Sequence, residues 1–195
     1  MTRRAPTGAA VLQPATTMAI TQAVLREWAE LGFARLSMES VAKRAGVGKS
    51  ALYRRWPSKQ EMAMAVLADH VVPLAVVPDT GSLRGDVRKS LDALTEWMTD
   101  PLLSRILPDL VAEMARNPEL AAFTDTVIGT PRRELARAKL LRAVDRGELR
   151  PDVDLELALD LLAASLYWRL SVRAADLEPG YHDKLTDLVM RAIGV

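Results

Sequence analysis

Basic side chains cluster in residues 49–59, and their chemistry suits a nucleic acid. Arg54 and Arg55 carry planar guanidinium groups, and each can donate two hydrogen bonds to O6 and N7 of a guanine. Lys59 stands at the expected start of a helix, where its ammonium and the free backbone N–H groups both suit a phosphate. Such contacts require a rigid element that fits a DNA groove, so the surrounding residues must provide one.

Residues 36–59 have the pattern of two short helices joined by a tight turn. Ser37 can cap the first helix, whose apolar residues recur at helical spacing at Met38, Val41, Ala42 and Ala45. Gly46 stands where this helix must end, and a second helix carrying Arg54 and Arg55 is expected to follow. Two helices joined by three or four residues that include a glycine are the helix-turn-helix pattern, which places its second helix in the major groove of DNA.

Charge is distributed unevenly along the chain, although the net charge is only +1. Residues 1–59 hold ten Lys and Arg against three Glu, whereas the remainder holds 16 basic and 22 acidic residues. A basic N-terminal part on an acidic body favours a polyanionic partner for the N-terminal part alone. A basic solvated surface is the alternative on charge alone, and the coincidence with the helix-turn-helix pattern argues against it.

The bulk composition is that of an ordinary globular protein, with 195 residues of which 49% are apolar and 26% charged. This length is enough for a substantial core in one or two small domains. No run of about 20 apolar residues could span a bilayer, so no membrane partner is expected, and the residues after Arg3 and Arg4 argue against a signal peptide. Cysteine is absent, which excludes disulfides and is consistent with a cytoplasmic location.

Helical periodicity continues on both sides of the basic stretch. Upstream, a helix over 16–31 is predicted from the apolar stripe Ile20, Val24, Trp28 and Leu31. Downstream, Ser58 and Glu61 form a capping box for a further helix, and five more helical segments follow, one of them kinked at Thr130-Pro131. The predicted fold class is all-α, with about nine helices in an N-terminal helix-turn-helix three-helix head joined to a larger helical body.

Enzymatic and metal-binding alternatives find little support. Gly48-Lys49-Ser50 is similar to the end of a phosphate-binding P-loop, but that motif needs a glycine where the chain has Lys43 and a preceding strand. His70 and His182 lie far apart in sequence, which favours solvated histidines over a metal site. The chain has no cysteine nucleophile and no Gly-x-Ser-x-Gly motif. The sequence therefore predicts neither an enzyme nor a bound metal or cofactor.

Residues 28–67 resemble the DNA-binding head of the tetracycline-repressor (TetR) family of bacterial regulators. Residues 142–169 also resemble one subgroup of the C-terminal domains of that family. The head pattern is specific because its spacings are fixed, and it consists of Leu31-Gly32-Phe33, Ser37, Val41-Ala42, Ala45-Gly46-Val47, Leu52-Tyr53 and Ser58-Lys59.

The resemblance implies a homodimeric transcriptional regulator, usually a repressor, that binds a palindromic DNA operator and releases it when a small molecule occupies the helical body. It also implies a set of DNA-binding residues, in which Ser37 and Lys59 hold phosphates and the others form the recognition helix and its approach: Ser37, Gly48, Lys49, Ser50, Tyr53, Arg54, Arg55 and Lys59. Gly48 stands where Ser or Thr is usual in the family, so a cap is missing there. The run Arg54-Arg55-Trp56 is also atypical, so the base preference of the family cannot be carried over.

The ligand site is expected among aromatic and methionine side chains of the body helices. The candidates for the pocket are Trp97, Met98, Leu103, Leu107, Met114, Phe123, Tyr167, Trp168 and Arg169. A stripe of such residues at helical spacing can equally be plain core. For Arg169, which lies in the most apolar helix, a structural salt bridge with a residue such as Glu113 is the alternative to a ligand carboxylate.

The last two helices carry more apolar surface than one body needs, and two helices from each subunit can form a four-helix interface. The predicted dimer residues are Leu157, Leu161, Ala164, Leu185, Leu188 and Val189.

The predicted organisation is a disordered arm over 1–15, a helix-turn-helix DNA-binding domain over 16–60, and an effector-binding and dimerisation domain over 61–195. Two other functions stay open at this level. One is a DNA-binding regulator or activator without an effector. The other is a helical partner-binding protein or an enzyme with an incidental helix-turn-helix.

Overall fold

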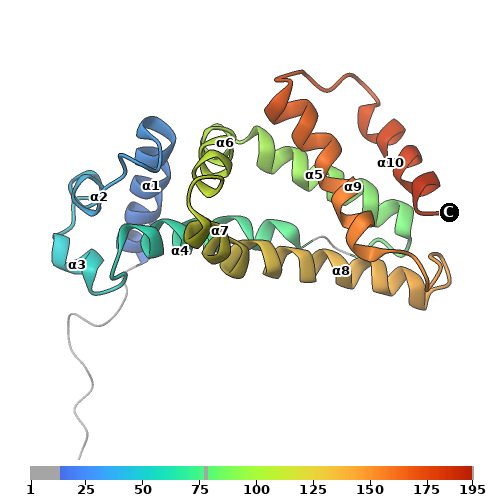
Figure 1. Ribbon diagram of the computed structural model, residues 1–195, viewed down its shortest axis with the longest axis horizontal. Coiled ribbons are helices and arrows are strands. Elements are labelled where there is room, and N and C mark those ends of the chain that lie inside the picture. Colours follow the sequence, from blue (N-terminus) through green and yellow to red (C-terminus); the bar gives the residue numbers. More distant parts are fainter. Residues whose placement is uncertain (1–13, 77–78, 195) are drawn as a thin grey trace, which may run out of the picture. The chain divides into compact units, whose positions relative to one another are not determined.

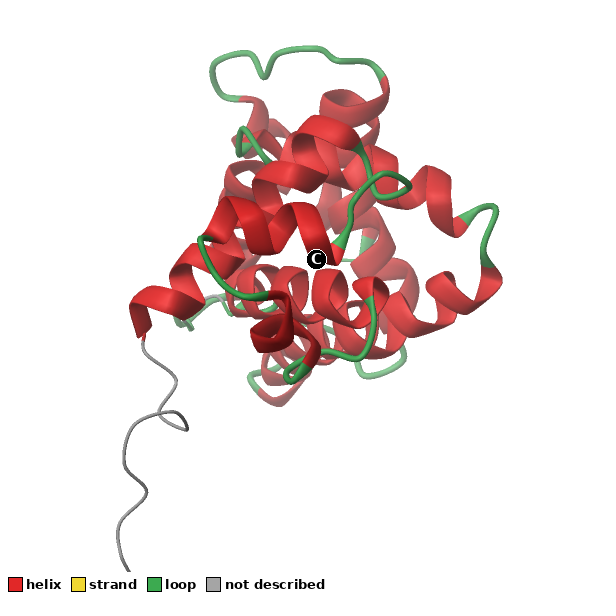
Figure 2. Ribbon diagram, turned by 90° about the vertical axis from the view of Figure 1, so that its left-hand side faces the viewer, coloured by secondary structure: helices red, strands yellow, loops and turns green. Residues whose placement is uncertain are grey.

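The computed structural model describes residues 14–76 and 79–194, and every regular element within them is a helix (Figure 2). The chain divides into two compact units, one up to Val66 and one from Leu67 onward. The first unit is built from α1 (Pro14–Leu31), α2 (Met38–Ala45), α3 (Lys49–Tyr53) and the greater part of α4 (Lys59–Val71). These helices are labelled in Figure 1.

The second unit begins within α4 and continues through all later elements. They are η1 (Pro73–Ala75), α5 (Leu83–Thr99), α6 (Leu103–Met114), α7 (Pro118–Thr124), η2 (Asp125–Gly129), α8 (Thr130–Asp145), α9 (Leu155–Tyr167), η3 (Trp168–Val172) and α10 (Tyr181–Ala192). The π-helical turn η2 joins α7 to α8 without a break, and η3 continues α9. Apart from the short 3-10 turn η1, the described residues therefore form nine continuous helical segments, and the predicted all-α class is confirmed.

The predicted N-terminal arm lies mostly outside the described residues. Of residues 1–15, only Pro14 and Ala15 are described, and they are the first residues of α1. The helix thus begins two residues before the predicted start. Proline suits this first position because its ring presets the helical φ and an N–H is not needed there.

The N-terminal unit is held by a small apolar core and one cation. Its fully buried large side chains include Ile20, Leu25, Trp28 and Leu52. Arg44 on α2 reaches α1, where its Nε lies 2.6 Å from Glu27 Oε1 and its Nη2 lies 2.5 Å from Glu30 Oε2. Because a forked guanidinium fits carboxylates in a defined geometry, this contact sets the position of α2 on α1.

The core of the C-terminal unit forms around α5, which contacts α8, α9 and α10 (Figure 1). The inner face of α5 is Leu83, Val87, Leu91 and Met98, which recur at helical spacing. Its partners across the core include Leu140, Ala143, Leu159, Leu162, Leu166, Leu185, Val189 and Met190. This packing places α5 and α8 side by side, and both helices line the cavity described below.

The kink predicted at Thr130-Pro131 is accompanied by the π-helical turn Asp125–Gly129. Pro131 has no N–H to donate, and its ring clashes with the carbonyl one turn earlier, so a regular α-helix cannot continue through it. A π-turn inserts one extra residue into the helix and absorbs this conflict. The following residue, Arg132, is thereby set on α8 directly after an irregular turn.

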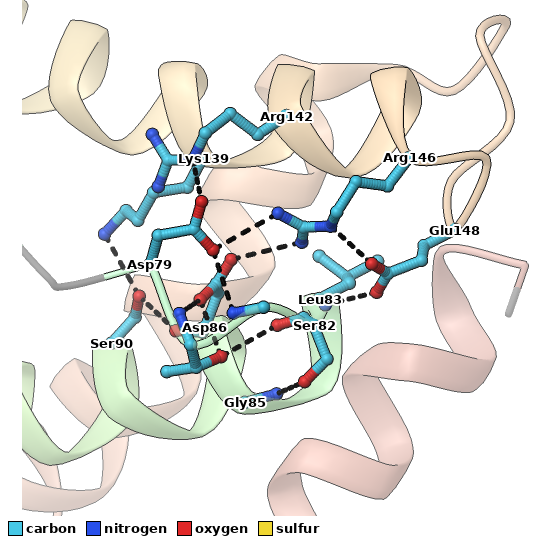
Figure 3. A network of polar contacts seen from close by, with 12 residues as sticks. Asp79, Ser82, Leu83, Gly85, Asp86, Ser90, Lys139, Arg142, Arg146 and Glu148 are labelled. Atoms are coloured by element: carbon cyan, nitrogen blue, oxygen red, sulfur yellow. Dashed lines mark hydrogen bonds and ion pairs between the residues drawn. The ribbon is translucent and has the colours of Figure 1, made fainter.

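A buried carboxylate organises the polar contacts between the start of α5 and the end of α8 (Figure 3). Asp86 is 2% exposed, and its Oδ1 accepts hydrogen bonds from the backbone N–H and the hydroxyl of Thr80, both at 2.8 Å. Its Oδ2 lies 3.4 Å from Arg146, which also pairs with Asp79 and Glu148. Burial raises the pKa of Asp86, but the Thr80 hydrogen bonds and the Arg146 guanidinium outweigh burial and hold the pKa below its ordinary value.

Lys139 on α8 is a buried cation at the edge of this cluster (Figure 3). Its Nζ lies 3.1 Å from Ser90 Oγ and 3.4 Å from the carbonyl of Ala75, and no described carboxylate lies within ion-pair distance of it. Burial lowers the pKa of Lys139 to about 8, and the nearby Asp86 opposes this shift only in part. The folded state therefore carries the cost of a desolvated ammonium at neutral pH.

Replacing Lys139 by Met should raise the free energy of unfolding by about 1–3 kcal/mol near pH 7, because a desolvated cation is exchanged for an apolar side chain of similar length. In the wild type, the unfolded lysine keeps its proton up to about pH 10.5 and the folded one only to about pH 8. Wild-type stability should therefore rise across that window relative to Lys139→Met, and the difference should shrink.

Urea unfolding at several pH values between about 7 and 10 measures this difference. Lys89→Met, the same change at an exposed position of α5, is the control and should have little effect at any pH. A difference that stays constant with pH would contradict the assignment of Lys139 as a costly buried cation.

Candidate functional site

The first helix of the helix-turn-helix is closed at both ends as the sequence predicts. Ser37 Oγ accepts a hydrogen bond of 3.1 Å from the N–H of Ser40. At the other end Gly46 has a φ of 68°, a left-handed conformation that glycine adopts without strain. Gly48 precedes α3 and offers no side-chain cap, in line with its departure from the family pattern. The turn between the helices is thus short and held at defined points.

The recognition helix α3 is anchored in the core by one apolar residue, and its polar side chains are exposed. Leu52 is fully buried, whereas Lys49 and Ser50 are exposed and Tyr53 is 55% exposed. Lys49 Nζ lies 2.6 Å from Glu39 Oε1, but both side chains are largely in water. An exposed ion pair of this kind contributes little free energy, so the lysine is available to a phosphate.

The two arginines lie in the turn after α3, because the helix ends at Tyr53. The prediction that the helix itself carries Arg54 and Arg55 is therefore wrong, and Pro57 shortly downstream explains the early end. Arg54 is exposed. Arg55 is half-buried, with its guanidinium 5.9 Å from the Trp56 ring and one nitrogen 3.4 Å from Thr17 Oγ1.

Lys59 is the first residue of α4, and its ammonium is directed inward. Nζ donates to the carbonyls of Phe33 at 2.9 Å and Ala34 at 3.2 Å, and it lies 4.7 Å from the centre of the Phe33 ring. Ser58 caps the helix by accepting from the N–H of Glu61 at 3.1 Å. The ammonium thus ties the start of α4 to the turn after α1, and the first backbone N–H groups of α4 are the donors that suit a phosphate.

An apolar cavity of about 460 Å³ lies inside the C-terminal unit, among the end of α4, α5, α6, the α7–α8 segment and α9. Cavities of this size and character are typical of small-molecule sites. Five residues of the predicted pocket line it: Trp97, Met98, Leu103, Leu107 and Met114.

The other four predicted pocket residues lie elsewhere. Phe123 and Tyr167 are partly buried but are not among the lining residues, and Trp168 is 60% exposed. Arg169 does form a salt bridge, but its partner is Glu178 at 2.8 Å and not Glu113. Glu113 instead pairs with Arg116 on its own helix. These residues were expected in the pocket from their helical spacing, which does not specify the direction of the face.

Three cations of α8 line the cavity, Arg132, Arg133 and Lys139, and sequence reasoning missed all of them. Arg132 donates a hydrogen bond to the carbonyl of Val71, the last residue of α4, and its guanidinium lies 4.8 Å from the centre of the Trp97 ring. Lys139 lies two turns further along the same face. For Arg132 and Lys139 the available signal was their spacing of seven residues, which places both on one helix face.

The predicted dimer residues fall into two groups. Leu157, Leu161 and Leu188 are exposed by 58%, 39% and 57%, and Ala164 is exposed as well. Leu185 and Val189 pack into the core of their own unit, which leaves the first group as the surface open to a partner. Trp168 and Val172 extend the same exposed face of α9 and η3.

Two other kinds of site are absent from the part of the chain that the structure describes. No group of three or more His, Cys, Asp or Glu side chains there could hold a metal ion. No described helix has both the length and the apolar character needed to cross a membrane.

Comparison with known proteins agrees with this arrangement. Residues 20–66 match the family "Bacterial regulatory proteins, tetR family", and residues 77–189 match "Tetracyclin repressor-like, C-terminal domain". The chain is 34% identical over 160 residues to the DNA-binding transcriptional repressor TetR of Mycobacteroides abscessus, covering 82% of this chain and 83% of that protein. It is 28% identical over 177 residues to the uncharacterized HTH-type transcriptional regulator YdeS of Bacillus subtilis, covering 91% and 87%.

Among solved structures, the TetR family transcription regulator SCO0332 is 30% identical, with a TM-score of 0.74 and coverage of 92% of this chain and 99% of that one. Regulators of this family are not enzymes. Since one family match alone spans more than half of the sequence and relatives cover most of it, the chain belongs to the tetracycline-repressor (TetR) family and is a helix-turn-helix transcriptional regulator that binds DNA.

Proposed function

We propose that the protein is a homodimeric repressor that leaves a palindromic operator when a small molecule occupies the cavity of its C-terminal unit. The observation that carries this proposal is an apolar cavity of about 460 Å³ lined by Leu67 and Val71, which belong to the same helix, α4, as Lys59. DNA binding is assigned to residues 16–60, and effector binding and dimerisation to residues 61–195.

The proposed DNA surface combines exposed side chains with helix N-termini. Lys49, Tyr53 and Arg54 are exposed on or directly after α3, where they suit contacts in the major groove. The remaining members are Ser37, Gly48, Ser50, Arg55 and Lys59, of which Ser37 and Lys59 stand at helix starts and suit backbone phosphates. Phosphate contacts set the position on DNA, and base contacts set the sequence preference.

The proposed dimer forms through the exposed apolar face of α9, η3 and α10. Leu157, Leu161, Trp168 and Leu188 are large apolar side chains exposed to water on these helices, and exposed apolar patches mark interaction sites. A symmetric pairing of these helices covers it with the same face of a second copy. In such a dimer, two recognition helices about 34–36 Å apart, or somewhat more, would reach successive turns of the major groove.

The proposed ligand response acts through α4. A molecule in the cavity contacts Leu67 and Val71 near the end of α4, and the start of the same helix is attached by Lys59 to the turn after α1. A ligand shifts the equilibrium only if it binds the operator-releasing conformation more tightly than the operator-binding one. The proposal therefore places the switch in the helix that is common to both units.

Removing one contact from the proposed DNA surface should weaken operator binding. Arg54→Ala should cost about 1–3 kcal/mol and relax sequence preference, because a guanidinium that reads a base is lost. Lys49→Ala should weaken binding to all sequences and lower the salt-dependence slope by about one. Fluorescence anisotropy with DNA flanking the gene of this protein measures both effects.

Lys89→Ala, an exposed lysine on α5 outside the proposed DNA and dimer surfaces, is the matched control and should bind DNA like the wild type. If both head variants also bind like the wild type, the recognition surface is assigned to the wrong residues. Absence of wild-type binding to this DNA at low salt would exclude the flanking region as the operator.

Deletion of the gene should raise transcription from the promoter to which the protein binds, because a repressor blocks it. Quantification of these transcripts with and without a complementing copy measures the effect. Lower transcription after deletion would instead establish an activator.

A charge placed in the exposed apolar face should break the dimer. Leu161→Glu puts a carboxylate where two copies are proposed to meet, and burying that charge is costly. Sedimentation velocity at micromolar concentration should show a dimer for the wild type and a monomer for Leu161→Glu. The control is Val111→Glu, the same charge at an exposed aliphatic residue of α6, which should remain dimeric. A monomeric wild type would refute the interface.

A further inference from the structure

Arg132 differs from the other charged residues that line the cavity. Arg133 is neutralised by Glu156 at 2.8 Å and Asp160 at 2.9 Å. Asp86 is held by Thr80 and Arg146, and Asp125 is exposed to water. Arg132 has no carboxylate partner among the described residues. Its guanidinium donates to a backbone carbonyl and lies over an aromatic ring.

Arg132 is partly buried, and its environment lacks an anion that would offset the loss of water around its charge. Burial lowers the pKa of Arg132, and no acidic group contributes to offset that shift. Lys139, which also lines the cavity, has the opposite charge of Asp86 nearby, although not within ion-pair distance. The remaining wall is made largely of Leu, Ile, Val, Met and Ala side chains. The cavity thus combines an apolar body with a cation, Arg132, whose charge no nearby acidic group offsets.

The position of Arg132 also connects the cavity to α4. The last carbonyl groups of a helix have no partner within the helix, and a cation at that end is favourable for the helix dipole. Arg132 supplies both features by donating to the carbonyl of Val71. Only Nη1 of Arg132 donates to Val71, so a carboxylate that binds the guanidinium through Nη1 competes with this carbonyl, because a carboxylate is the stronger acceptor.

We infer that the effector is an apolar molecule with a single carboxylate, and that this carboxylate binds Arg132 and draws it from the end of α4. The inference rests on the proposed function for the consequence at DNA, whereas the choice of ligand class rests on the cavity alone. The apolar part of the molecule lies against α5 and α6, along residues such as Trp97, Leu103 and Leu107.

Matched probes that differ only in the head group test the ligand class. Isothermal titration calorimetry of the full chain would compare decanoate, decanol and decylamine, with octyl, dodecyl and biphenyl carboxylates covering other body shapes. At least one carboxylate should bind about tenfold or more tightly than its alcohol, and the amine should bind most weakly. Equal binding of alcohol and carboxylate, or no binding of any carboxylate, would overturn the inference.

Variants of α8 then test the residue. Arg132→Met should bring the affinities for carboxylate and alcohol close together while leaving alcohol binding intact, and Arg132→Gln serves if the Met variant does not fold. Arg137→Met, the same change on the exposed face of α8, should keep the wild-type preference. Lys139→Met should reduce the preference less than Arg132→Met does. A preference that survives in both Arg132 variants would show that another group holds the head.

Hydrogen exchange over residues 68–76 tests the competition at α4 without DNA. The carboxylate should speed exchange of these amides, the alcohol should not, and Arg132→Met should exchange fast without any ligand. Unchanged exchange with bound carboxylate would overturn the coupling through Val71. DNA release is measured separately, so carboxylate binding at Arg132 without release would leave the ligand class standing and refute the proposed function.

Discussion

The two ends of α4 are held by cations that donate hydrogen bonds to backbone carbonyls. At its start, Lys59 of α4 donates to Phe33 and Ala34 in the N-terminal unit. At its end, Arg132 of α8 donates to Val71 in the C-terminal unit. Both bonds use carbonyls at or after helix ends, where the backbone has no partner within the helix itself. The proposed ligand response depends on this helix, because residues of α4 both line the cavity and contact the turn after α1.

A cluster of charged residues at the start of α5 and the end of α8 adjoins the polar part of the cavity lining, to which Asp86 and Lys139 belong. Asp86, Arg146 and Glu148 hold the start of α5 against the end of α8, where Glu148 also accepts the N–H of Leu83 (Figure 3). Lys139 is connected to the same cluster by a hydrogen bond to Ser90, whose hydroxyl donates to the carbonyl of Asp86 at 2.7 Å. Burying these charges costs free energy, and the hydrogen bonds recover only part of it. The cluster therefore lowers the stability of the fold but fixes the positions of the polar groups that line the cavity.

Local rules predicted the parts of the fold that depend on neighbours in the chain. Ser37, Gly46 and Ser58 act at helix ends, where capping depends on residues three or four positions away. Pro131 marks the irregular turn for the same reason. The prediction failed where helical spacing does not set the contact: it could not show that Arg169 binds Glu178 in the loop after η3, or that Leu185 and Val189 face inward while Leu188 faces water.

The sequence by itself determined the family, the all-α class and the exposed basic helix-turn-helix, because these follow from short-range spacing and from charge along the chain. Only the tertiary structure decided which cations lie in the cavity. Arg132 and Lys139 share a helix face by periodicity, but whether that face meets water, carboxylates or an apolar space depends on the packing of α4, α5 and α9 around it. Burial and the absence of a counter-ion are properties of that packing, and they are what distinguish Arg132 from the many other arginines of the chain.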